Sequence, residues 1–175
     1  MCGPYVLTAP SAVASTKYTP RRSFTTETSS MTTRRRAREV SLQVLYEEDI
    51  HPLRELSIAD DFLAKRMLHN KPLIAFAQAI LAGVRQNRDE LDKILTKHAS
   101  NWSVKRMTTI DRNILRMSTY EMVYGNVPGR VSINEAIELA KRYGSKNSGQ
   151  FVNGILDRIL REHTQNKKET ESVGS

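Results

Sequence analysis

From Thr33 onward the apolar residues recur at the spacing of an α-helix, and no stretch alternates as a β-strand would. In the first such stretch Ala37, Val40, Val44 and Leu45 fall on one face, before a helix-ending His51-Pro52 pair. This period constrains the fold most, because helices that each carry one apolar face must bury those faces against other helices. We therefore predict an all-α fold of six to seven helices, packed as two small bundles.

The second half of the chain has clear helix-start and helix-stop signals. The segment Gly125–Gly129 is expected to break one helix, and Ser132 to cap the next with Glu135 at the capping-box position. Gly144 supplies the expected stop, and Ser148 begins a last helix.

Composition narrows the class of protein further. Lys and Arg number 27 against 19 Asp and Glu, which gives a net charge of +8 and favours an anionic partner. The single cysteine, Cys2, excludes a disulfide framework and a thiolate metal site, and no apolar run is long enough to span a bilayer. We expect a soluble protein of a reducing compartment.

The two ends differ from the rest in composition. Residues 1–30 are rich in Ser and Thr and carry only one acid, Glu27, so we expect a disordered extension or sequence upstream of a start at Met31. Their composition weakly resembles an organellar transit peptide, which is the alternative. Residues 31–163 form the expected folded part, with bundles at about 34–99 and about 100–163, and residues 164–175 are an expected flexible tail.

Four arginines stand at the expected start of the first helix: Arg34, Arg35, Arg36 and Arg38. Each cation at a helix N-terminus costs about 0.3–1 kcal/mol, because the helix dipole is positive there. Arginine makes bidentate contacts to phosphate and stacks on bases, so nucleic-acid binding is the favoured interpretation. Attachment to an anionic membrane surface and a merely solvated first turn are the alternatives.

RNA is favoured over DNA, because no recognition helix of a helix-turn-helix is apparent and arginine-rich segments commonly become ordered on RNA. Tyr46 shares a helix face with Arg35 and Arg38 and is a candidate for stacking on a base; packing on a neighbouring helix is the alternative. Asn147 and Phe151 flank a polar loop, although Phe151 taken alone is better explained as a core residue.

An enzyme finds little support in the sequence. The four histidines are scattered, and no phosphate-binding loop, dinucleotide fingerprint or serine-nucleophile motif is present. Glu135 and Glu138 share a helix face, but capping and solvation explain them better than acid–base chemistry. We expect no catalytic residues, no cofactor and no metal.

Two segments carry a resemblance to a known family. RRRAREVSLQVLYEED near the start and VSINEAIELAKRYGSKNSGQFVNGILDRIL near the end resemble the signature segments of the NusB family of transcription antitermination factors. LAGVRQNRDELD and IDRNILRMSTYEMVY match in order and spacing, so the resemblance covers roughly residues 31–163. The family implies two three-helix bundles and a non-enzymatic protein of the bacterial cytosol.

The resemblance also implies partners. It implies binding of the single-stranded boxA element of nascent ribosomal RNA transcripts together with NusE, a small-subunit ribosomal protein. The pair joins the RNA polymerase elongation complex with other Nus factors and suppresses premature Rho-dependent termination. Some members form homodimers when free. The implied RNA face comprises Arg34, Arg35, Arg36, Arg38, Tyr46, Lys146, Asn147, Ser148, Gln150 and Phe151.

The implied NusE face comprises Asp111, Arg112, Leu115 and Arg116. Acidic residues expected just before that helix are replaced by Lys105 and Arg106, which departs from the family pattern. The alternative function is a NusB-like RNA-binding module that serves ribosomal RNA modification or maturation with a separate methyltransferase chain. A helix-packing scaffold is a third possibility, but it leaves the arginines without a role.

Overall fold

The computed structural model of the chain describes residues 27–52, 57–99, 103–125 and 127–173, and within these ranges it contains helices and turns but no strand. The predicted all-α class with six to seven helices is confirmed. The elements are α1 (Glu27–Ile50), α2 (Ser57–Arg66), α3 (Lys71–Gln86), α4 (Arg88–His98), the 3₁₀ turn η1 (Val104–Arg106), α5 (Thr109–Val123), α6 (Gly129–Tyr143) and α7 (Ser148–Val173). Residues 1–26, most of the expected N-terminal extension, lie outside the described residues.

Local sequence signals explain where α3 and α5 begin. The Asn70 side chain accepts a hydrogen bond from the Leu73 backbone N–H at 3.3 Å, and a proline follows in the first turn of α3. The Thr108 hydroxyl accepts from the Asp111 N–H at 3.1 Å at the start of α5. Each cap satisfies a backbone N–H that has no acceptor within the helix.

The expected capping role of Ser132 is wrong. α6 already begins at Gly129, with Pro128 at the N-cap position, so Ser132 lies inside the helix. Its buried hydroxyl donates instead to the Ser118 carbonyl on α5 at 3.1 Å. The capping-box pattern indicated a helix start, whereas Ser132 forms a hydrogen bond that joins α6 to α5.

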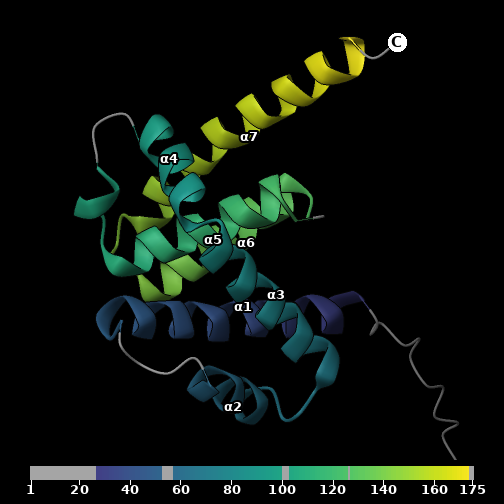
Figure 1. Cartoon of the computed structure of the whole chain (residues 1–175), viewed down its shortest axis with the longest axis vertical. Helices are drawn as coiled ribbons and strands as arrows, with labels where there is room; N and C mark the ends of the chain where they lie inside the picture. Colours follow the sequence, from purple (N-terminus) through teal and green to yellow (C-terminus); the bar gives the residue numbers. More distant parts are fainter. Residues whose placement is uncertain (1–26, 53–56, 100–102, 126, 174–175) are drawn as a thin grey trace, which may run out of the picture.

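Helix α5 lies at the centre of the molecule, where it packs against α1, α3, α4, α6 and α7 (Figure 1). Helices α1, α2 and α3 lie on one side of it, and α6 and α7 pack together on the other. The buried apolar side chains form one continuous core through both halves, which includes Leu63, Leu81, Leu91, Ile114, Leu115 and Leu156.

Two helices extend beyond their expected bounds. α1 begins at Glu27, about two turns before Arg34, so the arginines do not occupy its first turn. α7 continues to Val173, so residues expected in a flexible tail are helical, and Figure 1 shows this end projecting away from the body.

The approach of α3 to α5 depends on one glycine. A Cβ atom added at Gly83 would lie 1.9 Å from the Tyr120 ring carbon that bears the hydroxyl. The Tyr120 ring therefore occupies the space that a side chain at position 83 would need. It also stacks on Tyr124, with ring centroids 6.0 Å apart.

Candidate nucleic-acid interface

The arginines of α1 point in different directions because residues one turn apart share a face and adjacent residues do not. Arg34 and Arg38 both face the Phe76 ring of α3, with guanidinium carbons 5.6 and 5.2 Å from its centroid. Arg34 is nevertheless exposed, whereas Arg38 is buried. Arginines that are close together in the sequence thus lie in different environments in the structure.

Arg38 makes a buried ion pair that joins α1 to α5. Its Nε donates to both carboxylate oxygens of Glu121 at 3.0 Å, and its Nη1 lies 3.8 Å from Glu135 on α6. The Arg38 and Glu121 side chains are 6% and 3% exposed. The expected RNA-binding residue Arg38 is therefore committed to carboxylates inside the protein.

Arg35, which is partly exposed, pairs with Glu135, the buried glutamate of α6 that also lies near Arg38. Its Nε and Nη2 donate to the Glu135 carboxylate at 3.1 and 2.9 Å, a bidentate arrangement. This hydrogen bonding raises the pKa of Arg35 above its ordinary value. The expectation that Glu135 is a solvated capping residue is wrong, because it is buried between two arginines of α1.

Glu39 lies on α1, one turn after Arg35, and connects α1 to α6. Its two carboxylate oxygens accept from Arg36 Nη1 at 3.0 Å and from Arg142 Nη1 at 2.6 Å. The Glu39 side chain is 6% exposed, whereas those of Arg36 and Arg142 are 40% and 63% exposed. A buried carboxylate thus holds two arginines whose side chains are partly open to solvent.

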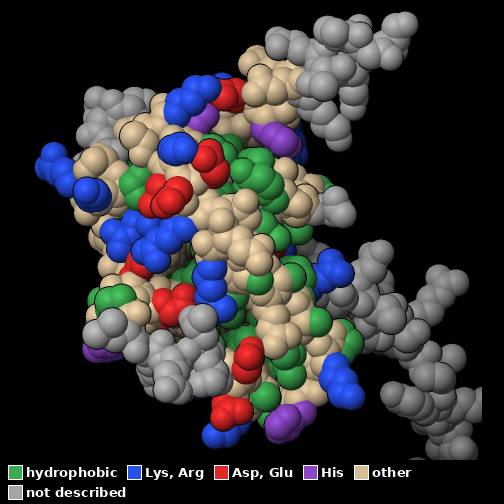
Figure 2. Space-filling view, viewed as in Figure 1, with side chains coloured by type: hydrophobic (Ala, Val, Ile, Leu, Met, Phe, Trp, Pro, Cys, Tyr) green, Lys and Arg blue, Asp and Glu red, His purple; other side chains and the backbone are tan. Residues whose placement is uncertain are grey.

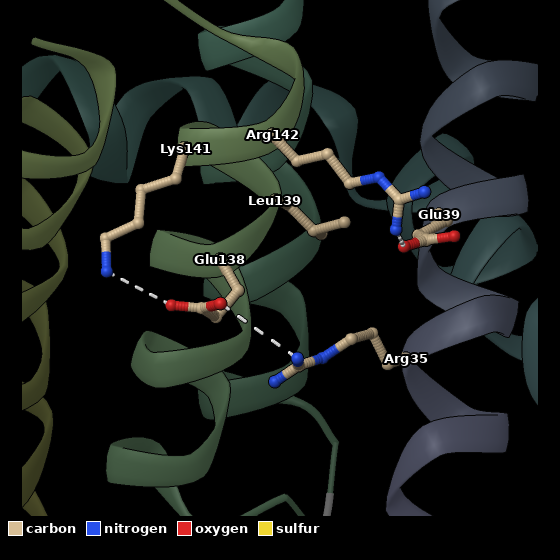
Figure 3. A pocket seen from close by; sticks show the side chains of 6 residues that line it. All are labelled: Arg35, Glu39, Glu138, Leu139, Lys141 and Arg142. Carbon is tan, nitrogen blue, oxygen red and sulfur yellow. Dashed lines mark hydrogen bonds and ion pairs between the residues drawn. The ribbon is translucent and has the colours of Figure 1, made fainter. Parts of the chain in front are cut away.

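A pocket of about 200 Å³ lies between α1 and α6, lined by Arg35, Glu39, Glu138, Leu139, Lys141 and Arg142 (Figure 3). Figure 3 shows Arg35 and Glu39 reaching in from α1, opposite the four lining residues of α6. Three cations and two carboxylates therefore share one concave surface. The sequence alone offers no reason to assign Lys141 or Arg142 a role in binding.

The loop between α6 and α7 adjoins this pocket. The Ser148 hydroxyl is buried and accepts from the Ser145 N–H at 2.8 Å, which closes the loop. A Cβ atom at Gly149 would lie 3.3 Å from Lys141 Cγ, so the start of α7 touches the pocket wall. The expected α1 arginines and the expected loop residues are thus connected through α6.

Gly144 has a different reason for being glycine than the one expected. Its φ of −91° and ψ of −168° are extended, so no left-handed stop is formed. A Cβ atom there would lie 2.5 Å from the Ser148 hydroxyl oxygen and 2.7 Å from the Ala140 carbonyl. The glycine leaves room for the serine that closes the loop.

The other expected RNA-face residues vary in exposure. Lys146, Asn147 and Gln150 are exposed, whereas Phe151 is half-buried and packs against the core. Tyr46 is 38% exposed. It lies eight residues beyond Arg38 on α1, about 12 Å along the helix axis.

The expected NusE-face residues lie mostly inside the protein. Asp111, Leu115 and Arg116 are buried, and Arg112 is partly buried. Arg116 makes a bidentate pair with Asp92 of α4, with both N···O distances at 2.8 Å. In this structure Arg112 and Arg116 pair with carboxylates of α1 and α4, and Leu115 lies in the core. The four residues therefore do not form an exposed face.

Asp49 connects the end of α1 to α4 and α5. Its carboxylate accepts from Arg88 at 2.5 Å, from Arg112 at 2.8 Å and from Arg116 at 3.3 Å. Burial alone would raise the pKa of Asp49, but the hydrogen bond from Arg112 and the charges of the neighbouring arginines hold it below its ordinary value of 3.8. The carboxylate is therefore ionised at neutral pH.

The charged surface is mixed. Figure 2 shows basic side chains interspersed with acidic ones over the face that it presents. Among the described residues, no three His, Cys, Asp or Glu side chains are grouped to hold a metal ion. Within the same ranges no helix has the length and apolar character needed to cross a membrane.

Comparison with known proteins gives one consistent result. The model of the NusB family matches residues 35–161. The chain is similar to the transcription antitermination protein NusB of Bdellovibrio bacteriovorus, with 39% identity over 135 residues, 76% of this chain and 98% of that protein. Its fold is similar to that of T. maritima NusB, with a TM-score of 0.68, 35% identity, and coverage of 78% of this chain and 96% of that one.

A further similar chain comes from a crystal structure of the antitermination factors NusB and NusE in complex with dsRNA. The TM-score is 0.67 and the identity 28%, over 75% of this chain and 98% of that chain.

Proposed function

Because the chain belongs to the NusB family, we propose that it is a transcription antitermination factor that binds single-stranded boxA RNA of nascent ribosomal RNA transcripts together with NusE. In this role it joins the RNA polymerase elongation complex with other Nus factors and prevents premature Rho-dependent termination. In this proposal it acts by binding RNA and a protein partner rather than by catalysis.

The observation that carries the proposal is the continuity of exposed cations from α1 across α6 to the following loop. Arg35 and Arg142 line one pocket, and the start of α7 touches Lys141 at its wall. Phosphate contacts supply most of the affinity of a nucleic-acid interface, and base contacts supply its sequence preference. A strand laid along this surface would meet guanidinium groups first and then the loop.

Within this surface we assign two kinds of role. Direct contact with RNA is proposed for the solvent-accessible members of the expected set, which are Arg34, Arg35, Arg36, Tyr46, Lys146, Asn147, Gln150 and the accessible part of Phe151. Arg38 and Ser148 are buried, and we propose that they position the others. Arg38 holds α1 against α5, and Ser148 closes the loop.

The proposed NusE interaction depends on α5 in a similar indirect way. Asp111, Arg112, Leu115 and Arg116 are covered by neighbouring helices to differing degrees, so we propose that they fix the orientation of α5 while exposed residues nearby meet the partner. The known complex of NusB and NusE with dsRNA supports a partner of this kind for a family member. Substitution of the buried members is then expected to weaken NusE binding through a change of fold.

The proposal is tested by titrating the protein with boxA-type RNA and with a scrambled RNA of equal length, each with and without NusE. We expect tighter binding of the boxA-type RNA, and a further gain when NusE is present. Equal affinity for the two RNAs would contradict the assignment. A preference for mature ribosomal RNA, with a methyltransferase chain bound, would favour the modification module instead.

A further inference from the structure

The two carboxylates that line the α1–α6 pocket differ in burial and therefore in how easily they can move. Glu39 is 6% exposed and joins Arg36 to Arg142 across the two helices. Glu138 is 46% exposed and makes only peripheral ion pairs. A buried carboxylate that accepts hydrogen bonds from two arginines is costly to displace, whereas an exposed carboxylate is not.

The contacts of Glu138 resemble those that a phosphate group would make. Its carboxylate lies 3.1 Å from Lys141 Nζ and 4.0 Å from Arg35 Nη1 (Figure 3). The other two donor nitrogens of Arg35 are already bonded to Glu135, so Nη1 is the one directed toward the pocket. A monoanion with two oxygen acceptors sits between two cations, and an RNA backbone phosphate has the same charge and the same two free oxygens.

We propose that Glu138 occupies the place of an RNA phosphate in the free protein, and that RNA binds by displacing it from Arg35 and Lys141. This inference rests on the proposed RNA-binding function and names one phosphate subsite within it. The pocket, with a volume of about 200 Å³, leaves open space beside these side chains. Arg142, held beside this subsite by Glu39, supplies a further donor.

Glu39 has the opposite role in this arrangement. It keeps Arg36 and Arg142 at a fixed spacing, and both of these side chains are partly exposed to solvent. Removing its charge would free both side chains, and RNA would have to order them again at an entropic cost. Glu39 is therefore a positioning residue, and Glu138 is a competitor of RNA.

The test compares neutral substitutions in four otherwise identical full-length proteins, titrated with boxA-type RNA. Glu138→Gln is expected to bind about twofold to fivefold more tightly than wild type, because an exposed competing ion pair is lost. Lys141→Gln is expected to bind more weakly by a similar factor, with a log–log salt slope shallower by about 0.7. Glu39→Gln is expected to bind more weakly, although it removes the same charge as Glu138→Gln.

Glu90→Gln is the matched control. Glu90 on α4 makes the same i, i+3 pair with Lys93 that Glu138 makes with Lys141, and it is 58% exposed. The control should match wild type. If Glu90→Gln tightens binding as much as Glu138→Gln, a general charge effect replaces the inference.

The outcomes also separate this inference from the proposed function. Unchanged or weaker binding by Glu138→Gln, in a protein whose wild type binds boxA-type RNA, overturns the displacement and leaves the function intact. Tighter binding by both Glu39→Gln and Glu138→Gln would contradict the proposal that Glu39 positions the arginines while Glu138 competes with RNA. If the wild type does not bind RNA at all, the proposed function itself fails.

Discussion

Arg38 and Glu121 are 83 residues apart in the sequence, and their side chains meet in a buried ion pair with both Nε···O distances at 3.0 Å. The pair fixes α1 against α5, the helix around which the others pack. The buried Arg38 therefore holds in place the helix that carries the exposed arginines. The surface proposed for RNA therefore depends on a contact inside the protein.

We expect Arg38→Ala to lower the free energy of unfolding by about 3–5 kcal/mol, because it leaves a buried carboxylate without its partner. Urea unfolding monitored by circular dichroism measures this loss. Arg34→Ala is the control, since Arg34 is exposed and, among the described side chains, contacts the Phe76 ring. Its expected loss is about 0.5–1 kcal/mol.

A second variant separates the charge from the packing. Replacing both partners, as Arg38→Met with Glu121→Leu, should restore much of the stability, because neither buried charge is then left unpaired. Arg38→Ala as stable as Arg34→Ala would show that the ion pair does not hold the helices together. Charge reversal at Arg38 is unsuitable as a test of RNA binding for the same reason, because it would place a second carboxylate beside the buried Glu121.

Acid should weaken the connection between α1, α4 and α5 through Asp49. Its pKa is lowered in the folded protein, so its stabilising contribution is complete above its unfolded pKa near 3.8 and is lost as the pH falls through the folded value. Asp49→Asn should therefore be less stable than wild type at pH 7 by about 3–5 kcal/mol. The difference in unfolding free energy should shrink as the pH falls below about 5. Parallel pH profiles for the two proteins would contradict this role.

Gly83→Ala should lower the free energy of unfolding by about 1–3 kcal/mol, because the new Cβ atom would overlap the Tyr120 ring. The overlap involves the outer atoms of that ring, so Tyr120→Leu, which lacks them, should recover part of the loss in the double variant. Thermal unfolding of the two single variants and the double variant measures this coupling. Strict additivity would mean that Gly83 does not set the approach of α3 to α5.

The helices themselves could be predicted from the sequence, because each carries apolar residues at helical spacing. The start of α1, the start of α6 and the end of α7 were not predicted correctly. Gly144 follows the last residue of α6 as expected, although it is needed for room beside Ser148. Helical period gives the direction of a side chain relative to its own helix axis. It does not say which neighbouring helix covers that direction.

This limit explains the differences at the candidate site. Arg34 and Arg38 look equivalent in the sequence, and only the packing of α5 and α6 makes one exposed and the other buried. Leu115 and Arg116 were expected at a partner surface, but α5 is covered by other helices. Arg142 was overlooked because its bridge to Glu39 joins residues 103 positions apart.

The central claim is that boxA-type RNA binds along the exposed cations of α1 and the loop before α7. The most direct measurement compares the affinity and salt dependence of wild type with those of the double variant Arg34→Gln/Lys146→Gln. Both residues are exposed, so the fold should be kept.

The control is the double variant Lys93→Gln/Lys97→Gln on α4, which removes the same charge outside the pocket and the loop. We predict that the first variant binds at least about tenfold more weakly, with a log–log slope shallower by about 1.4, and that the second binds nearly as wild type. Equal loss in both variants, or none in the first, would contradict the account.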